Sequence, residues 1–196
     1  MARPSLINRD AVVGAGLAIA DEWGLDAVTM GSVATRLKVT PMALYRHVAN
    51  KADLLDGIVE LLLTEFPPPP AGPWADRLAG LADAIRASAQ RHPSVFPLLL
   101  QRPATTPRAR RARESVYSAL KEAGMDEARI AQSERLISTA ILGFAASEAA
   151  GRFRNHSRRQ LDADFALLQE LLGRFIEFES RIVSEERPVP NTPSAP

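Results

Sequence analysis

The chain has 196 residues, of which 46% are hydrophobic and 24% charged, and its formal net charge is +1. This length and apolar content suffice for one or two folded units with a buried core. The chain contains no cysteine, which excludes disulfides and thiolate metal sites. No stretch approaches the roughly 18 uncharged apolar residues of a membrane span, and the N-terminus has no signal-peptide core. We therefore expect a soluble, cytoplasmic protein.

An apolar stripe at helical spacing predicts a first helix from residue 8 to about residue 23. Asn8 is suited to cap its beginning and Gly24 to end it. We expect the whole stripe to face the core, including its last member, an aromatic residue. The stripe consists of Val12, Ala15, Ile19 and Trp23.

Two short helices joined by a tight turn are predicted within residues 29–51. The first covers residues 32–37. Thr40 is expected to cap the second, which begins at Pro41 because proline has no N–H to leave unpaired there. Leu44 and Val48 lie four residues apart and would hold this helix to its neighbours. The outer face then presents tyrosine, arginine and histidine, which is typical of a helix-turn-helix recognition helix.

The same stretch has an unusual charge distribution. Between Ala27 and Ala52 there is no Asp or Glu. An acid-free basic window on a balanced chain is an electrostatic footprint of nucleic-acid binding. A segment that lacks acids by chance is the alternative, but the coincidence with a helix-turn-helix pattern favours DNA. The four cations of the window are Arg36, Lys38, Arg46 and Lys51.

A third punctuated start follows at Asn50, with Asp53 three residues later as in a capping box. Apolar residues continue this helix to about residue 66. Four consecutive prolines at residues 67–70 then end it and favour a stiff polyproline II segment. We expect an inter-domain linker there, and in addition a hinge that lets the preceding helix swing.

The remainder is predicted to be helical. The segments are residues 74–91, a short apolar helix or turn at 94–101, residues 108–123, a long helix from 127 to about 153, and a last helix at 161–183. The last two helices carry apolar residues on more than one side. Such faces favour a four-helix bundle formed by two subunits, with a larger monomeric core as the alternative.

Residues 29–51, T-M-x-x-V-A-x-x-L-x-V-T-P-M-A-L-Y-R-H-V-x-N-K, resemble the DNA-binding motif of tetracycline-repressor (TetR) family regulators. The most distinctive part is L-Y-R-H-V-x-N-K-x-x-L-L at residues 44–55. Lys38 departs from the family, which often has glycine there. If its backbone is left-handed, lysine costs roughly 1 kcal/mol relative to glycine, but it places a cation near the DNA backbone.

The resemblance implies an all-α fold with an N-terminal three-helix helix-turn-helix domain and a larger C-terminal helical domain for ligand binding and dimerisation. We therefore divide the chain at the helix-capping and proline-rich positions. The expected parts are a DNA-binding domain at 1–50, a connecting helix at 51–66, a Pro-rich linker at 67–73, an effector-binding and dimerisation domain at 74–184, and a disordered tail at 185–196.

On the DNA side, Arg46 is the first candidate for a base contact, since arginine pairs bidentately with guanine in the major groove. Met42 and Ala43 are candidates for thymine methyls. Polar neighbours are better placed for phosphates, which fix register; a merely solvated helix face is the alternative. Residues 1–7 are either disordered or a minor-groove arm. The full predicted DNA-binding set is Lys38, Thr40, Pro41, Met42, Ala43, Tyr45, Arg46, His47 and Lys51.

In the second domain, the helices between residues 74 and 144 are expected to enclose a space. TetR-family regulators bind an effector there, and the resemblance implies the same for this chain. Arg102 is a candidate anchor for a carboxylate or polar group, whereas ordinary core is the alternative for each apolar residue. The lining candidates are Leu81, Ile85, Phe96, Leu99, Arg102, Val116, Leu120 and Phe144.

The sequence thus predicts a ligand-responsive transcriptional regulator. We expect a repressor that binds a palindromic double-stranded operator as a homodimer and releases it when a small, largely apolar effector binds. The alternative is a DNA-binding regulator whose second domain only dimerises or binds a protein partner. The sequence shows no catalytic constellation, metal-ligand spacing or Gly-rich phosphate loop, so we expect neither an enzyme nor a metal or cofactor.

Overall fold

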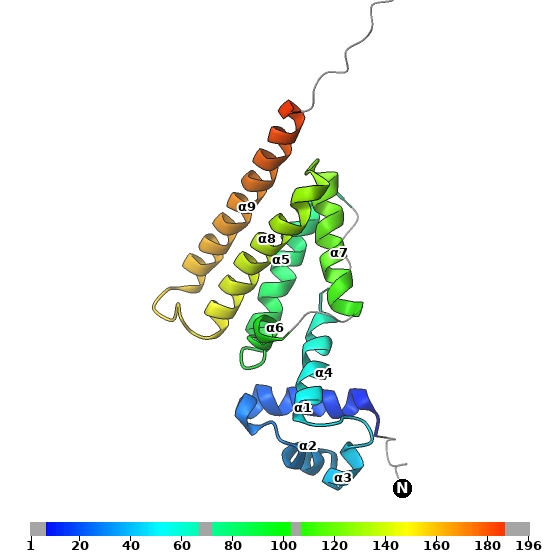
Figure 1. Cartoon of the computed structure of the whole chain (residues 1–196). Helices are drawn as coiled ribbons and strands as arrows, with labels where there is room; N and C mark the ends of the chain where they lie inside the picture. The colour runs from blue at the N-terminus through cyan, green and yellow to red at the C-terminus, as the bar shows by residue number, and fades with distance from the viewer. Residues whose placement is uncertain (1–6, 67–71, 103–106, 187–196) are drawn as a thin grey trace, which may run out of the picture.

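The computed structural model describes residues 7–66, 72–102 and 107–186, and within these ranges all regular structure is helical (Figure 1). The all-α prediction is therefore confirmed. The predicted arm lies outside the described residues except for Ile7, and so do residues 67–71 of the linker and 187–196 of the tail.

The N-terminal head contains α1 (Arg9–Trp23), the short 3-10 helix η1 (Leu25–Ala27), α2 (Met30–Leu37) and α3 (Pro41–Leu44). Asn8 caps α1 as predicted, because its Oδ1 accepts from the Ala11 N–H at 2.8 Å. The prediction that Trp23 is core is wrong, since its side chain is 66% exposed. Trp23 is the last residue of α1, and the fully buried Val28 fills that end of the core instead.

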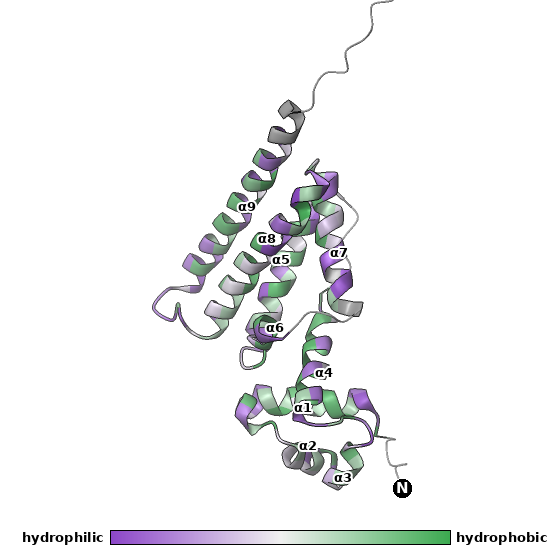
Figure 2. Cartoon of the chain, viewed as in Figure 1, coloured by the Kyte–Doolittle hydropathy of each residue, from purple (hydrophilic) through white to green (hydrophobic). Residues whose placement is uncertain are grey.

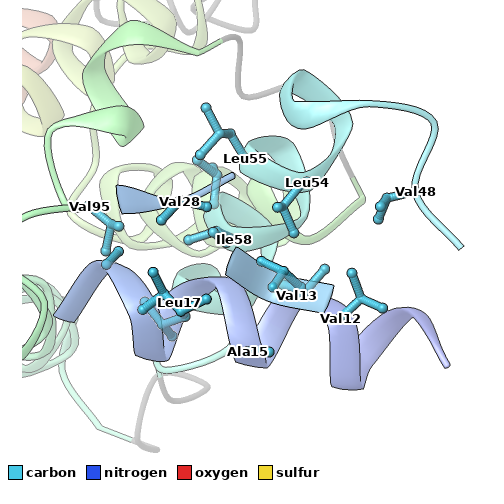
Figure 3. Close-up of a cluster of buried hydrophobic side chains, with 14 of the residues drawn as sticks. Val12, Val13, Ala15, Leu17, Val28, Val48, Leu54, Leu55, Ile58 and Val95 are labelled. Atoms are coloured by element: carbon cyan, nitrogen blue, oxygen red, sulfur yellow. The ribbon is translucent and has the colours of Figure 1, made fainter. Parts of the chain in front are cut away.

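Helix α4 (Lys51–Leu63) leads out of the head, and Figure 1 shows it rising from α1 towards the second domain. Asn50 caps it, with its Oδ1 accepting from the Asp53 N–H at 3.0 Å. The Asp53 carboxylate accepts from the Ala49 N–H at 2.7 Å, whereas a standard capping box would use the N–H of the cap residue itself. Leu54 and Ile58 of α4 are fully buried against α1 (Figure 3).

The C-terminal domain contains α5 (Trp74–Arg91), α6 (Leu98–Gln101), α7 (Pro107–Glu122), α8 (Glu127–Ala149) and α9 (Arg158–Glu186). Helix α5 packs most extensively on α8, and α7 packs on both. Helix α8 ends four residues earlier than predicted, before Gly151, whose backbone is left-handed with φ 72°. Helix α9 extends along the outer side of α8, and its last two residues fall in the stretch predicted as tail (Figure 1).

The turn between α5 and α6 contributes apolar side chains to the core of the head as well as to that of its own domain. Val95 is fully buried and Leu98 is 4% exposed, and both pack in the cluster built by α1 and α4. Figure 3 shows Val95 at the end of α1 that carries Leu17. The two domains therefore share apolar core through this turn as well as through α4.

Large apolar side chains remain exposed on the outer helices α8 and α9. Figure 2 shows hydrophobic residues interspersed with hydrophilic ones along the coloured part of α9. The exposed set is Leu136 of α8 with Leu167, Leu171 and Phe178 of α9, at 52–60% exposure. Ile176 of the same helix is 1% exposed and packs inward. Among the described residues, no helix is long and apolar enough to span a bilayer.

Candidate nucleic-acid interface

The recognition segment is a short helix that continues as a turn. Helix α3 covers only four residues, after which the His47 N–H donates to the Leu44 carbonyl at 2.8 Å. Leu44 and Val48 are buried at 0% and 1% exposure, so they anchor the segment as predicted. Pro41 occupies the first helical turn. Thr40 has the extended backbone of a cap residue, but its side chain makes no capping hydrogen bond, contrary to the prediction.

The supporting helix α2 begins at Met30, two residues earlier than predicted, because Thr29 and Ser32 cap it reciprocally. The Ser32 N–H donates to Thr29 Oγ1 at 3.0 Å, and the Thr29 N–H donates to Ser32 Oγ at 2.9 Å. The signal was present in the sequence, since a threonine followed three residues later by a polar side chain is a capping-box pattern.

Lys38 turns the chain between α2 and α3. Its backbone is left-handed, with φ 57° and ψ 44°, and it is the one non-glycine residue with positive φ among those described. The conformation that glycine would adopt freely is thus imposed on a lysine. Lys38 is exposed, and the next residue, Val39, is half-buried.

The outer face of the segment is open to solvent. Met42 is 74% exposed and Tyr45 48%, and Arg46 is also exposed. Pro41 and Lys51 are exposed, while His47 is half-buried. Five residues of the predicted set line a surface hollow of about 420 Å³: Thr40, Met42, Ala43, Tyr45 and Arg46. The structure therefore brings these five together, with Lys38, Pro41, His47 and Lys51 adjacent in the chain.

The four cations of the basic window are not equivalent. Arg36 makes a two-pronged ion pair with Glu22 of α1, at 2.5 and 3.0 Å, and this hydrogen bonding lowers the pKa of Glu22. The charge of Arg36 is therefore neutralised by an acid outside the basic window. The sequence did not reveal this pair, because Glu22 lies 14 residues before Arg36. In the part of the chain that the structure describes, Lys38, Arg46 and Lys51 form no ion pair, so they carry the uncompensated charge.

The predicted effector-lining residues fall in one apolar cluster of the C-terminal domain. Ile85, Phe96, Val116 and Leu120 are buried in it, and three more are partly buried against it: Leu81, Leu99 and Phe144. They come from α5, α7, α8 and the segment around α6. Phe144 stacks with Phe165 at a centroid distance of 5.3 Å. The structure thus brings the seven apolar candidates together.

Arg102, the eighth candidate, is engaged elsewhere. Its Nη1 donates to the Ala52 carbonyl at 3.1 Å and pairs with the Asp56 carboxylate, both on α4. Arg102 follows the last turn of α6, which lies beside α4, so the nearest acid is on the connecting helix. This arginine joins the C-terminal domain to the base of α4 instead of standing free beside the apolar cluster.

Sequence reasoning missed the polar group that does lie in this cluster. Arg86 of α5 is 9% exposed and makes a two-pronged pair with Glu148 at 2.6 and 2.8 Å and a third contact with Asp162 at 2.9 Å. Its guanidinium also lies 4.9 Å from the Phe165 ring centroid. Hydrogen bonding to Glu148 raises the pKa of Arg86. No local sequence pattern predicts this network, because both acids lie 62 or more residues from Arg86 in the chain.

The described residues contain no cluster of three or more His, Asp or Glu side chains suited to hold a metal ion.

Comparison with known proteins identifies relatives of this chain among HTH-type transcriptional regulators. HTH-type transcriptional repressor DrrR1 of Streptomyces coeruleorubidus is 29% identical over 170 residues, which are 83% of this chain and 61% of that protein. An HTH-type transcriptional regulator of Saccharopolyspora erythraea is also 29% identical, over 78% of this chain and 65% of the relative. The chain thus spans less than two thirds of the length of both relatives.

Two solved structures have a similar arrangement of helices. BioQ with its natural double-stranded DNA operator is 27% identical, with a TM-score of 0.71, covering 85% of this chain and 98% of that one. The Streptomyces coelicolor TetR family protein ActR in complex with actinorhodin has a TM-score of 0.76 over 90% of this chain and 99% of its own, at 24% identity. Both share the fold described above.

Two family descriptions match the chain and together cover nearly all of it. Residues 13–58 match "Bacterial regulatory proteins, tetR family" and residues 66–184 match "Tetracyclin repressor-like, C-terminal domain". The first spans α2, α3 and the supporting parts of α1 and α4, and the second spans α5 to nearly the end of α9. The chain belongs to the TetR family of transcriptional regulators, with a tetracycline-repressor-like C-terminal domain.

Proposed function

We propose that this protein is a repressor that binds a palindromic operator as a homodimer and releases it when a small, largely apolar effector enters the C-terminal domain. One observation carries the DNA-binding part. Met42, Tyr45 and Arg46 surround a hollow on a segment whose other side is buried through Leu44, and no acidic residue lies nearby in the chain. An exposed arginine and methyl-bearing side chains on a short helix suit base edges in the major groove.

The proposed DNA contacts divide by chemistry. Arg46 reads a guanine, and Met42 and Ala43 pack on thymine methyls. The remaining members bind phosphates or shape the surface and fix register. The structure of BioQ with its operator supports this use of the fold, at 27% identity. The phosphate-binding and surface group is Lys38, Thr40, Pro41, Tyr45, His47 and Lys51.

The homodimer rests on the exposed apolar side chains of α8 and α9. Leu136, Leu167, Leu171 and Phe178 are each at least half exposed in the single chain. Clustered exposed apolar side chains mark interaction sites in soluble proteins, and a two-fold pairing of α8 and α9 would cover these four in a four-helix bundle. Two heads on a two-fold axis then read two half-sites about one helical turn apart.

The effector is proposed to bind within the apolar cluster of Leu81, Ile85, Phe96, Leu99, Val116, Leu120 and Phe144. ActR in complex with actinorhodin supports a ligand site in this fold. Arg86, whose guanidinium lies over the Phe144 and Phe165 rings of this cluster, already has its charge balanced by Glu148 and Asp162. A largely apolar ligand therefore fits better than an anion, and Arg102 contributes to coupling instead of ligand anchoring.

Coupling to the head runs through both ends of the segment that contains α6. At its beginning, His92 Nδ1 lies 2.9 Å from Asp21 of α1 and Nε2 lies 2.9 Å from Glu65, which also pairs with Arg91 at 2.6 Å. At its end, Arg102 holds Asp56. Burial would raise the pKa of Glu65, but hydrogen bonding from Arg91 and the charge of His92 bring it below its ordinary value. An effector that displaces this segment would therefore move α1 and α4 together.

Two measurements test the proposal. The protein is first used to select duplexes from a random library, and we expect a two-fold symmetric sequence to be enriched. Thermal unfolding is then followed against a panel of apolar metabolites, and any stabilising compound is added to the operator complex. A compound that raises Tm and also weakens operator binding supports the effector role; allosteric coupling is typically about 5–150-fold. Stabilisation without release would favour a C-terminal domain that only dimerises or binds a protein partner.

A further inference from the structure

The exit of the recognition segment is held by two residues outside the proposed DNA contacts. Arg9, the first residue of α1, donates from Nη1 to the His47 carbonyl at 2.9 Å. It also makes a two-pronged pair with Asp53 of α4, at 2.5 Å from Nη2 to Oδ1 and 3.1 Å from Nη1 to Oδ2. Asp53 Oδ2 in turn accepts from the Ala49 N–H at 2.7 Å. One arginine and one carboxylate thus hold backbone groups on both sides of Val48.

The recognition segment needs such support because it is short. Helix α3 has four residues, far fewer than the roughly 12–15 at which an isolated helix becomes marginally stable. Leu44 and Val48 anchor its inner side in the core. The orientation of the helix axis then depends on how the residues that follow the segment are held. The His47 carbonyl and Ala49 N–H lie in that exit and require partners. Arg9 and Asp53 supply them and connect the exit to α1 and α4 at once.

The close approach of α1 and α4 makes this connection possible. A Cβ atom on Gly57 would lie 2.6 Å from Val13 Cγ2 of α1, which real Cβ contacts do not allow, and 3.6 Å from Arg9 Nη2. Gly57 is one turn after Asp53 on α4. The absence of a side chain at residue 57 therefore lets the helices come close enough for Arg9 to reach the Asp53 carboxylate.

We propose that Arg9 and Asp53 are positioning residues for operator recognition, which orient the recognition segment from residue 41 to residue 47 without contacting the DNA. This inference rests on the proposed DNA-binding function. Its physical content is that Asp53 balances the charge of Arg9 while the pair fixes the two backbone groups. Loss of either member lets α3 turn, so base reading suffers more than sequence-independent binding.

The rival role for Arg9 is a direct phosphate contact, since its side chain is 46% exposed at the start of α1. The two roles differ in what Asp53 does. If Arg9 binds phosphate, replacing Asp53 frees its charge and preserves or strengthens binding, and Arg9→Gln lowers the salt slope by about one. If Arg9 positions the segment, both replacements weaken operator binding and the salt slope stays unchanged.

The test uses the full chain with Arg9→Gln, Asp53→Asn and the double variant, on the operator that the wild-type protein selects and on a random duplex. The matched control is Glu22→Gln. Glu22 and Arg36 also form a two-pronged surface pair, between α1 and α2, and among the described residues neither forms a hydrogen bond or ion pair with the segment from 41 to 50. Glu22→Gln removes a carboxylate that pairs with an arginine, as Asp53→Asn does, but leaves the partners of the His47 and Ala49 backbone groups in place.

We expect each single replacement to weaken operator binding about tenfold and the double variant to be no weaker than about the worse single, because the residues act as a unit. Random-duplex binding and the Glu22→Gln control should change less than about twofold. Operator binding by Asp53→Asn at the wild-type level, or equal losses on operator and random duplex, would overturn the proposal.

A DNA-free readout keeps the outcome clear. Hydrogen exchange of the Ala49 amide should be slow in the wild type, faster in Arg9→Gln and Asp53→Asn, and unchanged in Glu22→Gln. Unchanged exchange in the first two variants contradicts the positioning role, whatever the DNA results. A failure of the proposed function appears differently, as a wild-type protein that selects no sequence at all.

Discussion

Two arginines, Arg46 of the head and Arg86 of the C-terminal domain, have opposite surroundings. In the turn that follows α3, Tyr45 and Arg46 face solvent, and no ion pair of Arg46 is present among the described residues. On α5, Arg86 is 9% exposed and is surrounded by Glu148, Asp162 and an aromatic ring. The first arrangement leaves hydrogen-bonding capacity for an external partner, and the second uses it up inside the protein.

The difference indicates where function and scaffold lie. A charged side chain that is solvated and unpaired contributes little to stability and is free for recognition. A charged side chain that is buried and paired is costly to unpair and therefore fixes a packing arrangement. Replacements in the two regions should accordingly separate effects on stability from effects on DNA binding.

The largest stability effect is expected at Arg86. Replacing it with alanine leaves the Glu148 carboxylate, with an 11% exposed side chain, without its cation. Unpairing a buried charge costs about 3–5 kcal/mol, measurable as a lower free energy of unfolding in urea. Arg174→Ala is the control, because Arg174 pairs with Glu170 at the surface, where the loss should be below about 0.5 kcal/mol. Similar losses for both arginines would contradict the contrast.

A second effect is expected within α3 itself. Leu44 is fully buried, and Leu44→Ala should lower the free energy of unfolding by about 2–5 kcal/mol through lost burial and a cavity. Met42 is two residues away and 74% exposed, so Met42→Ala should stay within about 0.5 kcal/mol while weakening operator binding. Equal destabilisation by the two replacements would mean that Met42 does not belong to an outward surface.

A smaller effect should depend on pH. The hydrogen bond from Arg9, and next the Ala49 N–H, lower the pKa of Asp53 against the opposing effect of burial. A carboxyl with a depressed folded-state pKa stabilises above its unfolded pKa of about 3.9 and loses this as the pH falls. The stability difference between wild type and Asp53→Asn should be constant, at roughly 1 kcal/mol, above about pH 5 and shrink below pH 4. Urea titrations across that range measure it; a difference that grows with acid would be inconsistent.

The smallest effect is expected at Lys38. Its left-handed backbone should make Lys38→Gly more stable by at most about 1 kcal/mol, partly offset by the greater freedom of glycine in the unfolded chain. If the ammonium contacts a phosphate, the salt slope of operator binding should fall by about one. A Lys38→Gly variant that is less stable than wild type would contradict the expected strain at residue 38. An unchanged salt slope would contradict the phosphate contact.

The sequence predicted the local features of the head and missed the long-range ones. The burial of Leu44 and Val48 and the Asn50 cap follow from spacing and residue type within a few positions, whereas the left-handed backbone at Lys38 was suggested only by the resemblance to a family that often has glycine there. The pairing of Arg36 with Glu22 does not, because its partner is 14 residues away on another helix. Periodicity assigned Trp23 to the core, but the last buried residue of α1 is Ala20.

The effector half was harder to predict for the same reason. Ile85, Phe96 and Leu120 were proposed as lining residues from the resemblance, and they share one cluster. Periodicity does not distinguish a ligand wall from ordinary core, and it gives no partner for a charge. Arg86 and Arg102 could be placed only once the helices were assembled, when Glu148 and Asp56 proved to be their neighbours.

The most direct test of DNA reading concerns Arg46. Wild type and Arg46→Ala are titrated against the selected operator and against operators with each guanine of one half-site replaced in turn. A bidentate contact predicts that wild type loses about 1–3 kcal/mol at one guanine, and that Arg46→Ala binds more weakly overall but no longer distinguishes that base. If Arg46→Ala instead loses the same affinity on every operator and on random duplex, Arg46 does not read a base and the proposed recognition surface is contradicted.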